Sequence, residues 1–285
     1  MARLSRIAVL ISCFNRREQT LAALHQLFAQ TRISLELLTV FLVDDGSTDG
    51  TSEAVAAEFP KVHILKGDGS LFWNGGMRKA FDAALREDFD YFLWLNDDSN
   101  LYPDAIERLL ACARDYEARN VPAIVTGTMV SPVTGERTYG GRRMRPDGLR
   151  LEFDAVYPDP VAPVECSTMN GNFVLIPVII AKTLKNLDPV FRHQIGDLDY
   201  GLRALRAGFR VVVAPGTHGV CSDNSRKATW RDGSAPLNVR WKHIMSPKGA
   251  PPREWLRYIR RHFGWRWPMY AVSPYLKALL GRSGK

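Results

Sequence analysis

Two adjacent carboxylates follow the apolar segment Tyr91–Leu95. Asp97 and Asp98 come after Asn96, and a helix is expected over residues 105–116. The apolar segment is short and aromatic, which is typical of a buried strand. Hard oxygen ligands suit Mg²⁺ or Mn²⁺ that holds a diphosphate, and the carboxyl edge of an α/β sheet is where such folds bind ligands. The alternative is that both carboxylates only turn the chain and face water.

A second acidic pair, Asp44 and Asp45, ends the apolar segment 36–43 and leads into a helix over 51–59. Carboxylates there can accept hydrogen bonds from a base N–H or a ribose hydroxyl, and Gly46 lets the backbone turn tightly. Capping of the helix explains Ser47, Thr48 and Asp49. It does not explain the acidic pair at the strand end.

A glycine-rich loop precedes a helix that is expected from about residue 75 to residue 85. Backbone N–H groups at a helix start attract phosphate, and a glycine pair lets a ligand approach closely. The chain lacks both a Gly-x-Gly-x-x-Gly fingerprint after its first strand and the Gly-Lys-Ser/Thr of a P-loop, which disfavours NAD enzymes and P-loop NTPases. The loop residues that could bind a substrate are Gly67, Asp68, Trp73, Asn74, Gly75 and Gly76.

Strands and helices alternate along the part of the chain that carries these motifs. Strand patterns and helical spacings succeed one another four times within residues 1–116, which is the order of a parallel sheet covered on both faces. The crossovers should be right-handed. The expected strands are 7–11, 36–43, 62–65 and 91–95, and the expected helices are 17–30, 51–59, 75–85 and 105–116.

The second half of the chain continues this pattern after one irregular stretch. Residues 131–163 are rich in Gly, Pro and Arg, and they predict a β-hairpin and an ordered loop over the sheet. The other elements expected are strands over 123–126, 166–176 and 209–213, and helices over 177–184 and 197–207.

Length and composition indicate a globular protein with a large core. The chain has 285 residues, of which 46% are hydrophobic, and no stretch approaches the ~20 apolar residues of a membrane span. The apolar run at the N-terminus is too short for a signal peptide and lacks a small-residue cleavage site. The four cysteines are far apart, which favours reduced thiols in a cytoplasm over disulfides or zinc.

Positive charge is concentrated at the end of the chain. Residues 226–285 contain 14 Lys or Arg and 2 Asp or Glu, a net charge of +12, whereas the first 225 residues have a net charge of −4. This asymmetry suggests an anionic partner, namely membrane phospholipid, a lipid-linked phosphate or nucleic acid. A non-enzymatic basic module is therefore one alternative, although no helix-turn-helix, zinc or RNA-recognition signature appears.

The basic C-terminal segment has its own helical pattern. Residues 253–263 predict a basic amphipathic helix, two more Trp follow, and residues 275–280 predict a short apolar helix. Arg mixed with Trp suits a membrane interface, where the aromatic body is buried and Arg meets lipid phosphate. The alternative is that the helix packs onto the rest of the protein and closes the acceptor site.

Taken together, these motifs resemble the family 2 glycosyltransferases of the GT-A fold over about residues 5–225. The fragment Phe72–Met77 looks like bacterial members that build O-antigen or related surface polysaccharides, often called rhamnosyltransferase-like. The segments that carry the resemblance are Ser12–Arg16, Val43–Asp49, Leu95–Ser99, Asn170–Asn172 and Gly196–Ala204.

The resemblance implies the architecture. The expected fold is α/β, a GT-A (Rossmann-like) and mostly parallel sheet with helices on both faces, plus a basic helical C-terminal extension. Residues 1–225 would form the catalytic domain, and residues 226–285 the Trp-rich extension.

The implied activity is inverting, metal-dependent transfer of a sugar from a nucleotide-diphosphate sugar to a saccharide acceptor in bacterial surface polysaccharide synthesis. The acceptor would be lipid-linked, at the inner face of the cell membrane. A sugar nucleotidyltransferase is the enzymatic alternative, but those enzymes have a Gly-rich first loop, which Ser12–Arg17 lacks.

Two acidic residues of one expected helix receive roles from the resemblance. Asp197 matches the family's catalytic base, although Gly196 replaces the Glu often found before it. Asp199 would orient Asp197 or an acceptor hydroxyl. The alternative for Asp197 is that it only caps the helix it begins.

The resemblance also implies a Mg²⁺ or Mn²⁺ site. Asn96 stands at the first position of the family's Asp-x-Asp motif, so Asp98 is the expected metal ligand, while Asp97 contacts ribose or a metal-bound water. His218 would complete the site as in some GT-A enzymes, and His193 is a weaker candidate. A lone His is more often a hydrogen-bonded or surface residue.

The donor and acceptor would be held by residues from several of these loops. Asp44 or Asp45 would hold the base and ribose, and Asn170–Asn172 would shape the sugar pocket. The alternative for Gly171 is a bulge in a strand. The full set of implied substrate-binding residues is Asn15, Asp44, Asp45, Gly67, Asp68, Trp73, Asn74, Gly75, Gly76, Asn96, Asp97, Asn170, Gly171, Asn172 and Asp199.

Overall fold

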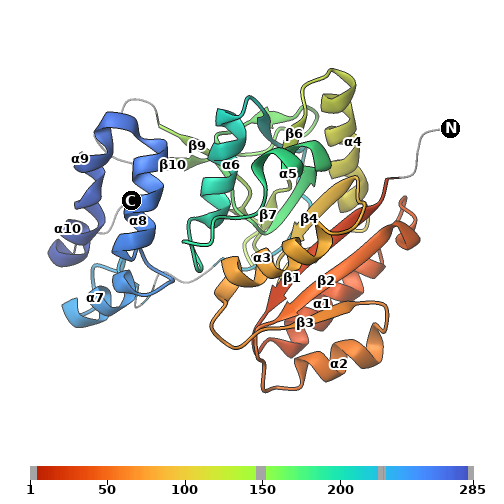
Figure 1. Ribbon diagram of the computed structural model, residues 1–285, viewed down its shortest axis with the longest axis horizontal. Coiled ribbons are helices and arrows are strands. Elements are labelled where there is room, and N and C mark those ends of the chain that lie inside the picture. The colour runs from red at the N-terminus through yellow and green to blue at the C-terminus, as the bar shows by residue number, and fades with distance from the viewer. Residues whose placement is uncertain (1–4, 146–151, 224–226, 228, 282–285) are drawn as a thin grey trace.

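The computed structural model describes residues 5–145, 152–223, 227 and 229–281 (Figure 1). Its centre is an eight-stranded sheet with the order β11-β14-β6-β13-β4-β1-β2-β3. Neighbouring strands are parallel from β3 through β2 and β1 to β4, and again between β6 and β14. The predicted α/β fold with a mostly parallel sheet is therefore confirmed. The strands are β1 (Ile7–Cys13), β2 (Leu38–Asp44), β3 (His63–Lys66), β4 (Tyr91–Leu95), β6 (Ala123–Thr126), β11 (Val164–Glu165), β13 (Phe173–Pro177) and β14 (Arg210–Val213).

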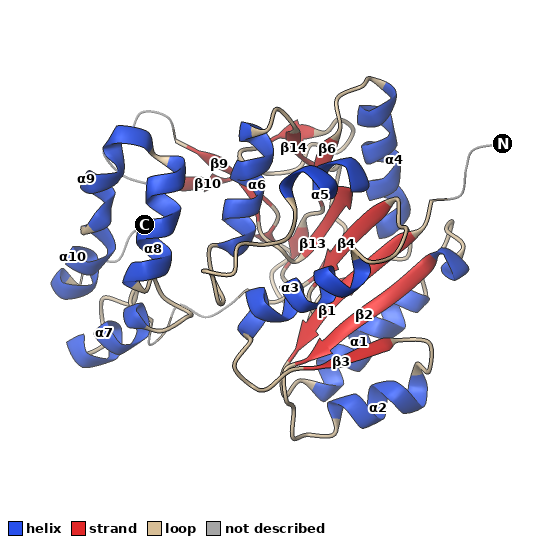
Figure 2. Ribbon diagram, in the orientation of Figure 1, coloured by secondary structure: helices blue, strands red, loops and turns tan. Residues whose placement is uncertain are grey.

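Helices cover both faces of this sheet (Figure 2). Alternate residues of each strand point to opposite faces, so Ile7, Val9 and Ile11 join one core cluster while Ala8 and Leu10 join the other. The first cluster is covered by α1 (Arg17–Phe28), α2 (Thr51–Glu58) and α4 (Ala105–Ala118). The second is covered by α3 (Phe72–Ala84), α5 (Val178–Leu184) and α6 (Gly196–Arg206).

The strand predicted over 166–176 is wrong in its extent. The chain makes the short strand β12 (Thr168–Met169), breaks at residues 170–172, and then forms β13, which runs antiparallel to both β4 and β6. Pro177 is the last residue of β13 and the N-cap of α5, which begins at Val178, a place where the missing N–H of proline is tolerated. The break leaves the Asn-Gly-Asn segment beside the end of β4.

The stretch 131–163 takes part in two small ladders, in line with the predicted hairpin, although residues 146–151 lie outside the described part. The strand pairs in these ladders are antiparallel, except that β7 and β15 are parallel. One ladder joins β10, β9 and β12, and the other joins β5, β15, β7 and β8. Their bounds are β5 (Asn100–Leu101), β7 (Met129–Val130), β8 (Arg137–Tyr139), β9 (Gly141–Met144), β10 (Phe153–Ala155) and β15 (Gly219–Val220).

The C-terminal segment is helical and shares a core with the rest of the molecule. Tyr258, Ile259 and Tyr270 are buried together with Phe191 and Leu202, which lie on α6 and the loop before it. Figure 1 shows these helices as one group beside α6. The group consists of α7 (Leu237–Met245), α8 (Pro252–His262), the 3₁₀ turn η2 (Gly264–Arg266), α9 (Trp267–Ala271) and α10 (Ser273–Leu280).

Two α-helices of this segment, α7 and α9, and the turn η2 were not predicted from the sequence. The predicted helix over 253–263 corresponds to α8 and the one over 275–280 to α10. Among the described residues, no helix combines the length and apolar character needed to cross a bilayer.

Candidate active site

Polar side chains from three neighbouring strands meet at one edge of the sheet. Because β1, β2 and β4 are parallel, their carboxyl ends lie together, and Cys13 is paired with Asp44 in register. The antiparallel strand β13 adds its start to the same edge, where the Asn96 N–H donates a 3.0 Å hydrogen bond to the carbonyl of Asn172. The predicted acidic loops and the Asn-Gly-Asn segment therefore share one site.

The Asp97–Asp98 pair is bridged by a positive charge. The Nη1 of Arg16, in the loop after β1, donates to Asp97 Oδ1 at 3.1 Å and to Asp98 Oδ2 at 2.8 Å. Asp97 is buried, and burial raises its pKa to about 7 because the opposing effect of the Arg16 charge is smaller and the Asp98 charge adds to the rise. Asp98 is more exposed, with 30% of its side chain accessible.

These carboxylates fit a divalent cation by the chemistry of their donor atoms, and the Arg16 guanidinium already places a cation between them. The described residues form no group of three or more His, Cys, Asp or Glu side chains able to hold a metal alone. Such an ion would therefore take its other ligands from donor phosphates and water, as Mg²⁺ commonly does.

His218 lies below this edge, fully buried at the start of β15. Its Nδ1 accepts a hydrogen bond from the Thr128 N–H at 3.2 Å, while its Nε2 has no partner among the described residues. Burial lowers the pKa of His218 to about 3, so the ring is neutral with its proton on Nε2. In that tautomer neither nitrogen offers a lone pair to a metal. His218 as a metal ligand stays a prediction, and binding through Nε2 would require that nitrogen to give up its proton.

The second predicted metal-site histidine, His193, is also neutral. Burial, followed by the charges of Lys248 and Arg16, lowers its pKa to about 4. Its Nδ1 accepts a hydrogen bond from the Trp73 N–H at 3.5 Å. His193 therefore helps to hold the start of α3.

Asp44 and Asp45 hold the loops around them. Asp45 is buried and accepts hydrogen bonds from the N–H groups of Gly69 and Phe72, both at 3.0 Å. Asp44 accepts from the Ser47 N–H at 2.8 Å and from the Ser52 hydroxyl. The two carboxylates thus position the glycine-rich loop and the start of α2, and their contact with a nucleotide stays a prediction.

Asn15 and Asp68 lie in the loops that flank this pair. Asn15 Oδ1 accepts a hydrogen bond from the Thr48 N–H at 2.8 Å, and its own N–H donates to Ser47 Oγ at 2.9 Å. The exposed Asp68 accepts from the N–H of Ser70 at 2.9 Å. Both stay candidates for substrate contact on the open side of the site.

Trp73 connects the metal-side loop with the Asn-Gly-Asn segment. Its indole Nε1 donates to Asn96 Oδ1 at 2.7 Å. The ring lies so close to Gly171 that a Cβ at that position would be 2.4 Å from Trp73 Cζ2. Gly171 is therefore required for close approach, which is a stronger reason than the bulge considered from sequence.

At three residues after the glycine-rich loop, the structure differs from what the sequence predicted. The helix α3 begins at Phe72 and not near Gly75, so the Gly75 N–H donates to Leu71 O at 3.1 Å and is not free for phosphate. Gly76 is buried, and a Cβ there would meet Ser12 Oγ at 2.0 Å, so this glycine serves packing between β1 and α3. Asn74 is fully buried, and its Nδ2 donates to Phe191 O at 2.6 Å.

Asn74 therefore holds the loop before α6, whereas Gly75 and Gly76 serve the start of α3 and its packing on β1, and substrate contact by these three residues stays a prediction. Gly67 is constrained in the same way at the other end of the loop. Its N–H donates to Asp44 O at 2.6 Å, and a Cβ there would lie 2.4 Å from Asp45 Oδ1.

Asp197 lies at the first turn of α6, against the Asn-Gly-Asn segment. Its Oδ2 accepts a hydrogen bond from the Gly171 N–H at 3.0 Å, and its Oδ1 accepts from the Leu198 N–H at 2.8 Å. Burial raises the pKa of Asp197 despite these two N–H groups. Ile195, the N-cap of α6 two residues before Asp197, has a φ of +74°, which is strained for a β-branched side chain. Asp197 thus combines a raised pKa with a fixed position, which suits a general base.

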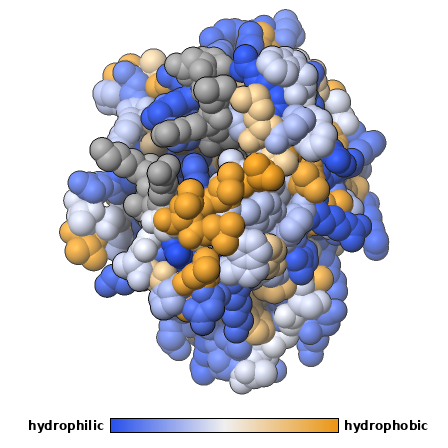
Figure 3. Space-filling model, turned by 90° about the vertical axis from the view of Figure 1, so that its left-hand side faces the viewer, coloured by the Kyte–Doolittle hydropathy of each residue, from blue (hydrophilic) through white to orange (hydrophobic). Residues whose placement is uncertain are grey.

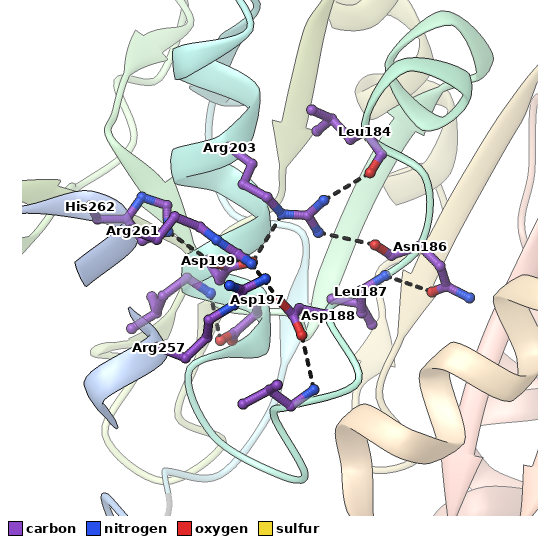
Figure 4. Close-up of polar contacts among 12 residues, drawn as sticks. Leu184, Asn186, Leu187, Asp188, Asp197, Asp199, Arg203, Arg257, Arg261 and His262 are labelled. Atoms are coloured by element: carbon purple, nitrogen blue, oxygen red, sulfur yellow. Dashed lines mark hydrogen bonds and ion pairs between the residues drawn. The ribbon is translucent and has the colours of Figure 1, made fainter. Parts of the chain in front are cut away.

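Asp199, two residues further on, faces away from this site. It is fully buried and accepts hydrogen bonds from Arg203 Nε at 2.9 Å, Arg261 Nη1 at 2.7 Å and His262 Nε2 at 2.8 Å (Figure 4). The oxygens of Asp199 are thus occupied by α6 and α8, so the prediction that it orients Asp197 or an acceptor hydroxyl gains no support from these contacts and stays a prediction. The residue fastens the C-terminal helices to α6.

The Asn-Gly-Asn segment fills the space between these parts. Asn170 Oδ1 accepts a 3.1 Å hydrogen bond from Arg142 Nε, and the buried Asn172 donates from Nδ2 to Cys221 Sγ at 3.6 Å. Cys221 in turn donates to Asp98 Oδ1 at 3.5 Å. Contact of Asn170 with a sugar stays a prediction, whereas the side chain of Asn172 supports Asp98 through Cys221.

Sequence reasoning gave no role to Arg16 or Cys221, although both touch the acidic pair. The signal for Arg16 was its place directly after β1, because the carboxyl ends of β1 and β4 meet at the same edge. Cys221 carried no such signal, since it lies beyond β14 and reaches Asp98 only through the ladder of β15 with β5.

Comparison with known proteins gives a consistent result. The sequence pattern of glycosyl transferase family 2 matches residues 8–170, more than half of the chain. The galactofuranosyltransferase GlfT2 of Mycobacterium tuberculosis is 28% identical over 252 residues, which cover 79% of this chain and 39% of the relative. GlfT2 of Mycolicibacterium smegmatis is 26% identical over 254 residues, covering 79% of this chain and 38% of the relative. The chain thus spans about two-fifths of the length of these curated relatives.

Solved structures share the fold at low sequence identity. A mannosyltransferase of Pyrobaculum calidifontis in complex with GDP-Man and Mn²⁺ has a TM-score of 0.58 and 18% identity, over 98% of this chain and 73% of that one. GalNAc-T7 with UDP, GalNAc and Mn²⁺ has a TM-score of 0.68 and 13% identity, over 94% of this chain and 50% of that one. The GT-A-like architecture is thereby shown.

The family match leaves the alternatives of a sugar nucleotidyltransferase and a basic nucleic-acid-binding module without support. It covers the strand ends that carry the two acidic pairs and extends to the Asn-Gly-Asn segment. The chain belongs to glycosyl transferase family 2, a family of glycosyltransferase enzymes with the GT-A fold.

Proposed function

We propose that this protein is an inverting, metal-dependent glycosyltransferase that moves a sugar from a nucleotide-diphosphate sugar to a saccharide acceptor. The observation that carries the proposal is a continuous set of contacts from Asp98 to Asp197. Asn96 joins the Asp98 loop to Asn172 and Trp73, and Gly171 touches both Trp73 and Asp197. A donor diphosphate beside Asp98 and an acceptor hydroxyl beside Asp197 would then share one site.

In this arrangement Asp197 takes the proton of the acceptor hydroxyl, and its fixed Oδ2 orients that oxygen toward the anomeric carbon. Arg16 supplies positive charge next to the phosphates. A bound Mg²⁺ or Mn²⁺ would stabilise negative charge on the leaving diphosphate. Asp98 would hold this ion, and Asp97 would support it from its buried position.

We also propose that residues 1–225 form the catalytic unit and that residues 226–285 complete it from one side. The shared core of Tyr258, Ile259 and Tyr270 with Phe191 and Leu202 supports this division of roles. It corresponds to the alternative in which the C-terminal helix closes the acceptor site. The extension would then contribute to catalysis by holding α6 in place.

The cellular role we propose is bacterial surface polysaccharide synthesis with a lipid-linked acceptor at the inner face of the cell membrane. The mycobacterial relatives are galactofuranosyltransferases. The fragment Phe72–Met77 resembles rhamnosyltransferase-like proteins of O-antigen synthesis. Galactofuranose and rhamnose are therefore the two donor sugars to test first.

Thermal unfolding with UDP, dTDP and GDP, each with and without Mn²⁺ or Mg²⁺, tests the donor site. A ligand at a hundred times its dissociation constant stabilises the folded state by about 2.7 kcal/mol, which for a chain of this size raises Tm by about 5 °C. We expect such a rise with one diphosphate only, and only with metal. Asp98→Ala should abolish it, and the exposed Asp115→Ala should keep it.

The transfer step is tested with Asp197→Asn. Removing a general base lowers the rate by about 10²–10⁴-fold. The variant should retain the metal-dependent Tm shift while losing transfer, because Asp197 lies on the acceptor side. Transfer at the wild-type rate would remove Asp197 from the mechanism, and the absence of any diphosphate-dependent shift in the wild type would contradict the donor site.

A further inference from the structure

An unbroken line of apolar side chains lies on the outer surface of the C-terminal helices. These side chains leave large fractions exposed to water, from 43% for Met269 to 79% for Trp265. We call this line the apolar stripe. It consists of Trp265, Met269, Val272, Leu276, Leu279 and Leu280.

The stripe follows helical geometry. Its members are spaced by four, three, four and three residues, with Leu279 and Leu280 adjacent at the end, which places them on one side of a continuous helix. The helices α9 and α10 are nearly continuous, since the Leu276 N–H donates to Val272 O at 3.0 Å across their junction. The residues on the other side, Tyr270 and Ala278, are buried against the protein.

The helix pair is therefore apolar on two sides, one of which packs inward while the other meets solvent. Figure 3 views the molecule from this side and shows hydrophobic side chains gathered across the middle of the face, with hydrophilic residues around them. Large contiguous apolar surfaces of this kind are uncommon on soluble proteins and mark contact with a membrane or another molecule.

Positive charge gathers on α8, the helix that packs against α9. A cavity of about 560 Å³ between α8 and the end of α6 is lined by five arginines. Two of them, Arg257 and Arg261, form ion pairs with Asp188. For the other three, the described residues provide no ion pair with a carboxylate. The five are Arg206, Arg253, Arg257, Arg260 and Arg261.

Arg260 connects the cavity to the helices of the stripe. It lines the cavity, and its guanidinium lies 4.5 Å above the ring of Trp267 in α9. Arg266 lies in the same way over Trp265 of the stripe, at 5.4 Å. Guanidinium groups beside Trp rings are suited to the boundary between phosphate headgroups and acyl chains.

We propose that α8, α9 and α10 bind the surface of a membrane that contains anionic phospholipid. The apolar stripe enters the acyl boundary, and Arg206, Arg253 and Arg260 bind lipid phosphates. Both parts are needed, because apolar burial gives the attachment and basic charge selects an anionic surface.

Two other partners, a second copy of the chain and nucleic acid, fit this face less well. Pairing of two copies through the stripe would bring the arginine-rich surface of one molecule toward that of the other, and like charges oppose such contact. Nucleic acid would neutralise the arginines but would leave Val272, Leu276 and Leu280 exposed to water. An anionic bilayer satisfies both the charge and the apolar surface.

Cosedimentation of the full chain with vesicles tests the proposal. The probes are phosphatidylcholine vesicles with and without about one-third phosphatidylglycerol, a lipid that supplies the anionic charge. We expect binding to the anionic vesicles only, and weaker binding as salt is raised. Leu276→Asp should lower the binding by about tenfold or more, because interfacial binding scales with buried apolar area. Arg253→Gln should lower it by a smaller factor.

Matched controls lie elsewhere on the surface. Val161→Asp changes an apolar side chain that is 84% exposed and outside the stripe, and Arg86→Gln changes an exposed arginine outside the cavity. Both should bind vesicles as the wild type does. Vesicle binding is measured without donor or acceptor, so its outcome is separate from that of the transfer assay.

Three results would overturn the proposal. The first is an absence of wild-type binding to anionic vesicles. The second is an equal loss of binding in Leu276→Asp and Val161→Asp. The third is a dimer in sedimentation velocity that Leu276→Asp converts to monomer, because the stripe would then be covered by a second copy.

Discussion

The buried ion cluster between α6 and α8 offers the sharpest test of how the C-terminal helices contribute. Arg261 is its centre. Its Nη1 donates to both oxygens of Asp199, at 2.7 and 2.8 Å, and its Nη2 donates to Asp188 (Figure 4). Replacing Arg261 by Met keeps an unbranched, largely apolar side chain but removes the guanidinium and its charge, so the two carboxylates lose their common partner.

The expected loss follows from burial. The side chain of Asp199 is fully buried and that of Asp188 is 9% exposed, so neither can exchange the arginine for bulk water. Removing one partner of a buried ion pair costs 3–5 kcal/mol in typical cases. Asp199 keeps Arg203 and His262 and Asp188 keeps Arg257, so we expect the low end of that range, about 3 kcal/mol of unfolding free energy.

The neighbouring residue provides a matched control. Arg260 is exposed and lies over the ring of Trp267, and a contact of that kind is worth about 0.5–1 kcal/mol. Urea unfolding of Arg261→Met and Arg260→Met, followed by circular dichroism, compares the two directly. Transfer activity should fall in Arg261→Met, because Asp199 lies two residues from Asp197 on the same helix.

The reasoning fails if Arg261→Met costs less than about 1 kcal/mol, as an exposed ion pair would. It also fails if the two variants lose the same amount, since burial would then have no part in the effect. A loss of stability with wild-type transfer would show that α8 is fastened to α6 without influencing Asp197.

Two further predictions concern the site and the acid stability of the cluster. Gly171→Ala should lower the transfer rate by about 10²-fold while the fold is retained. The new methyl group would displace Trp73 and break its hydrogen bond to Asn96, and misplacement of about 1 Å is enough for such a loss. A wild-type transfer rate in this variant would contradict the close packing. Burial alone would raise the pKa of Asp199, but the His262 hydrogen bond and the charges of Arg203 and Arg261 outweigh it and lower the pKa. A carboxyl whose pKa is lowered by folding stabilises the protein above its unfolded pKa of about 3.9, so urea midpoints should be unchanged by this group from pH 7 to 5 and should fall below about pH 4. This sign would be contradicted if the urea midpoint of the wild type fell steadily between pH 7 and 5 while the midpoint of Asp199→Asn stayed constant.

The fold could be predicted from local patterns because they agree with one another. Four short apolar segments, each followed by helical spacing, correspond to β1 to β4 with α1 to α4. The places where the prediction failed are junctions. The start of α3 moved forward to Phe72 because Asp45 accepts a hydrogen bond from its N–H, a contact 27 residues away in sequence.

The same limit applies to strand direction. The pattern of residues 166–176 indicates a strand, but nothing local distinguishes a parallel from an antiparallel neighbour. The pairing of β13 with β4 and β6 decides it, and this pairing brings Asn172 next to Asn96.

The sequence by itself determined the alternation of strands and helices, the two acidic pairs at strand ends and the basic charge of the C-terminal segment. These follow from residue type and short-range spacing. Only the tertiary structure decided which polar side chains form structural hydrogen bonds and which remain available at the site. Asn74 and Asp199 are polar residues within the motifs that predicted the site, yet both are buried and hydrogen-bonded to distant segments. A polar residue must find a partner wherever it is buried, and that partner is set by how the chain packs and not by its neighbours in sequence.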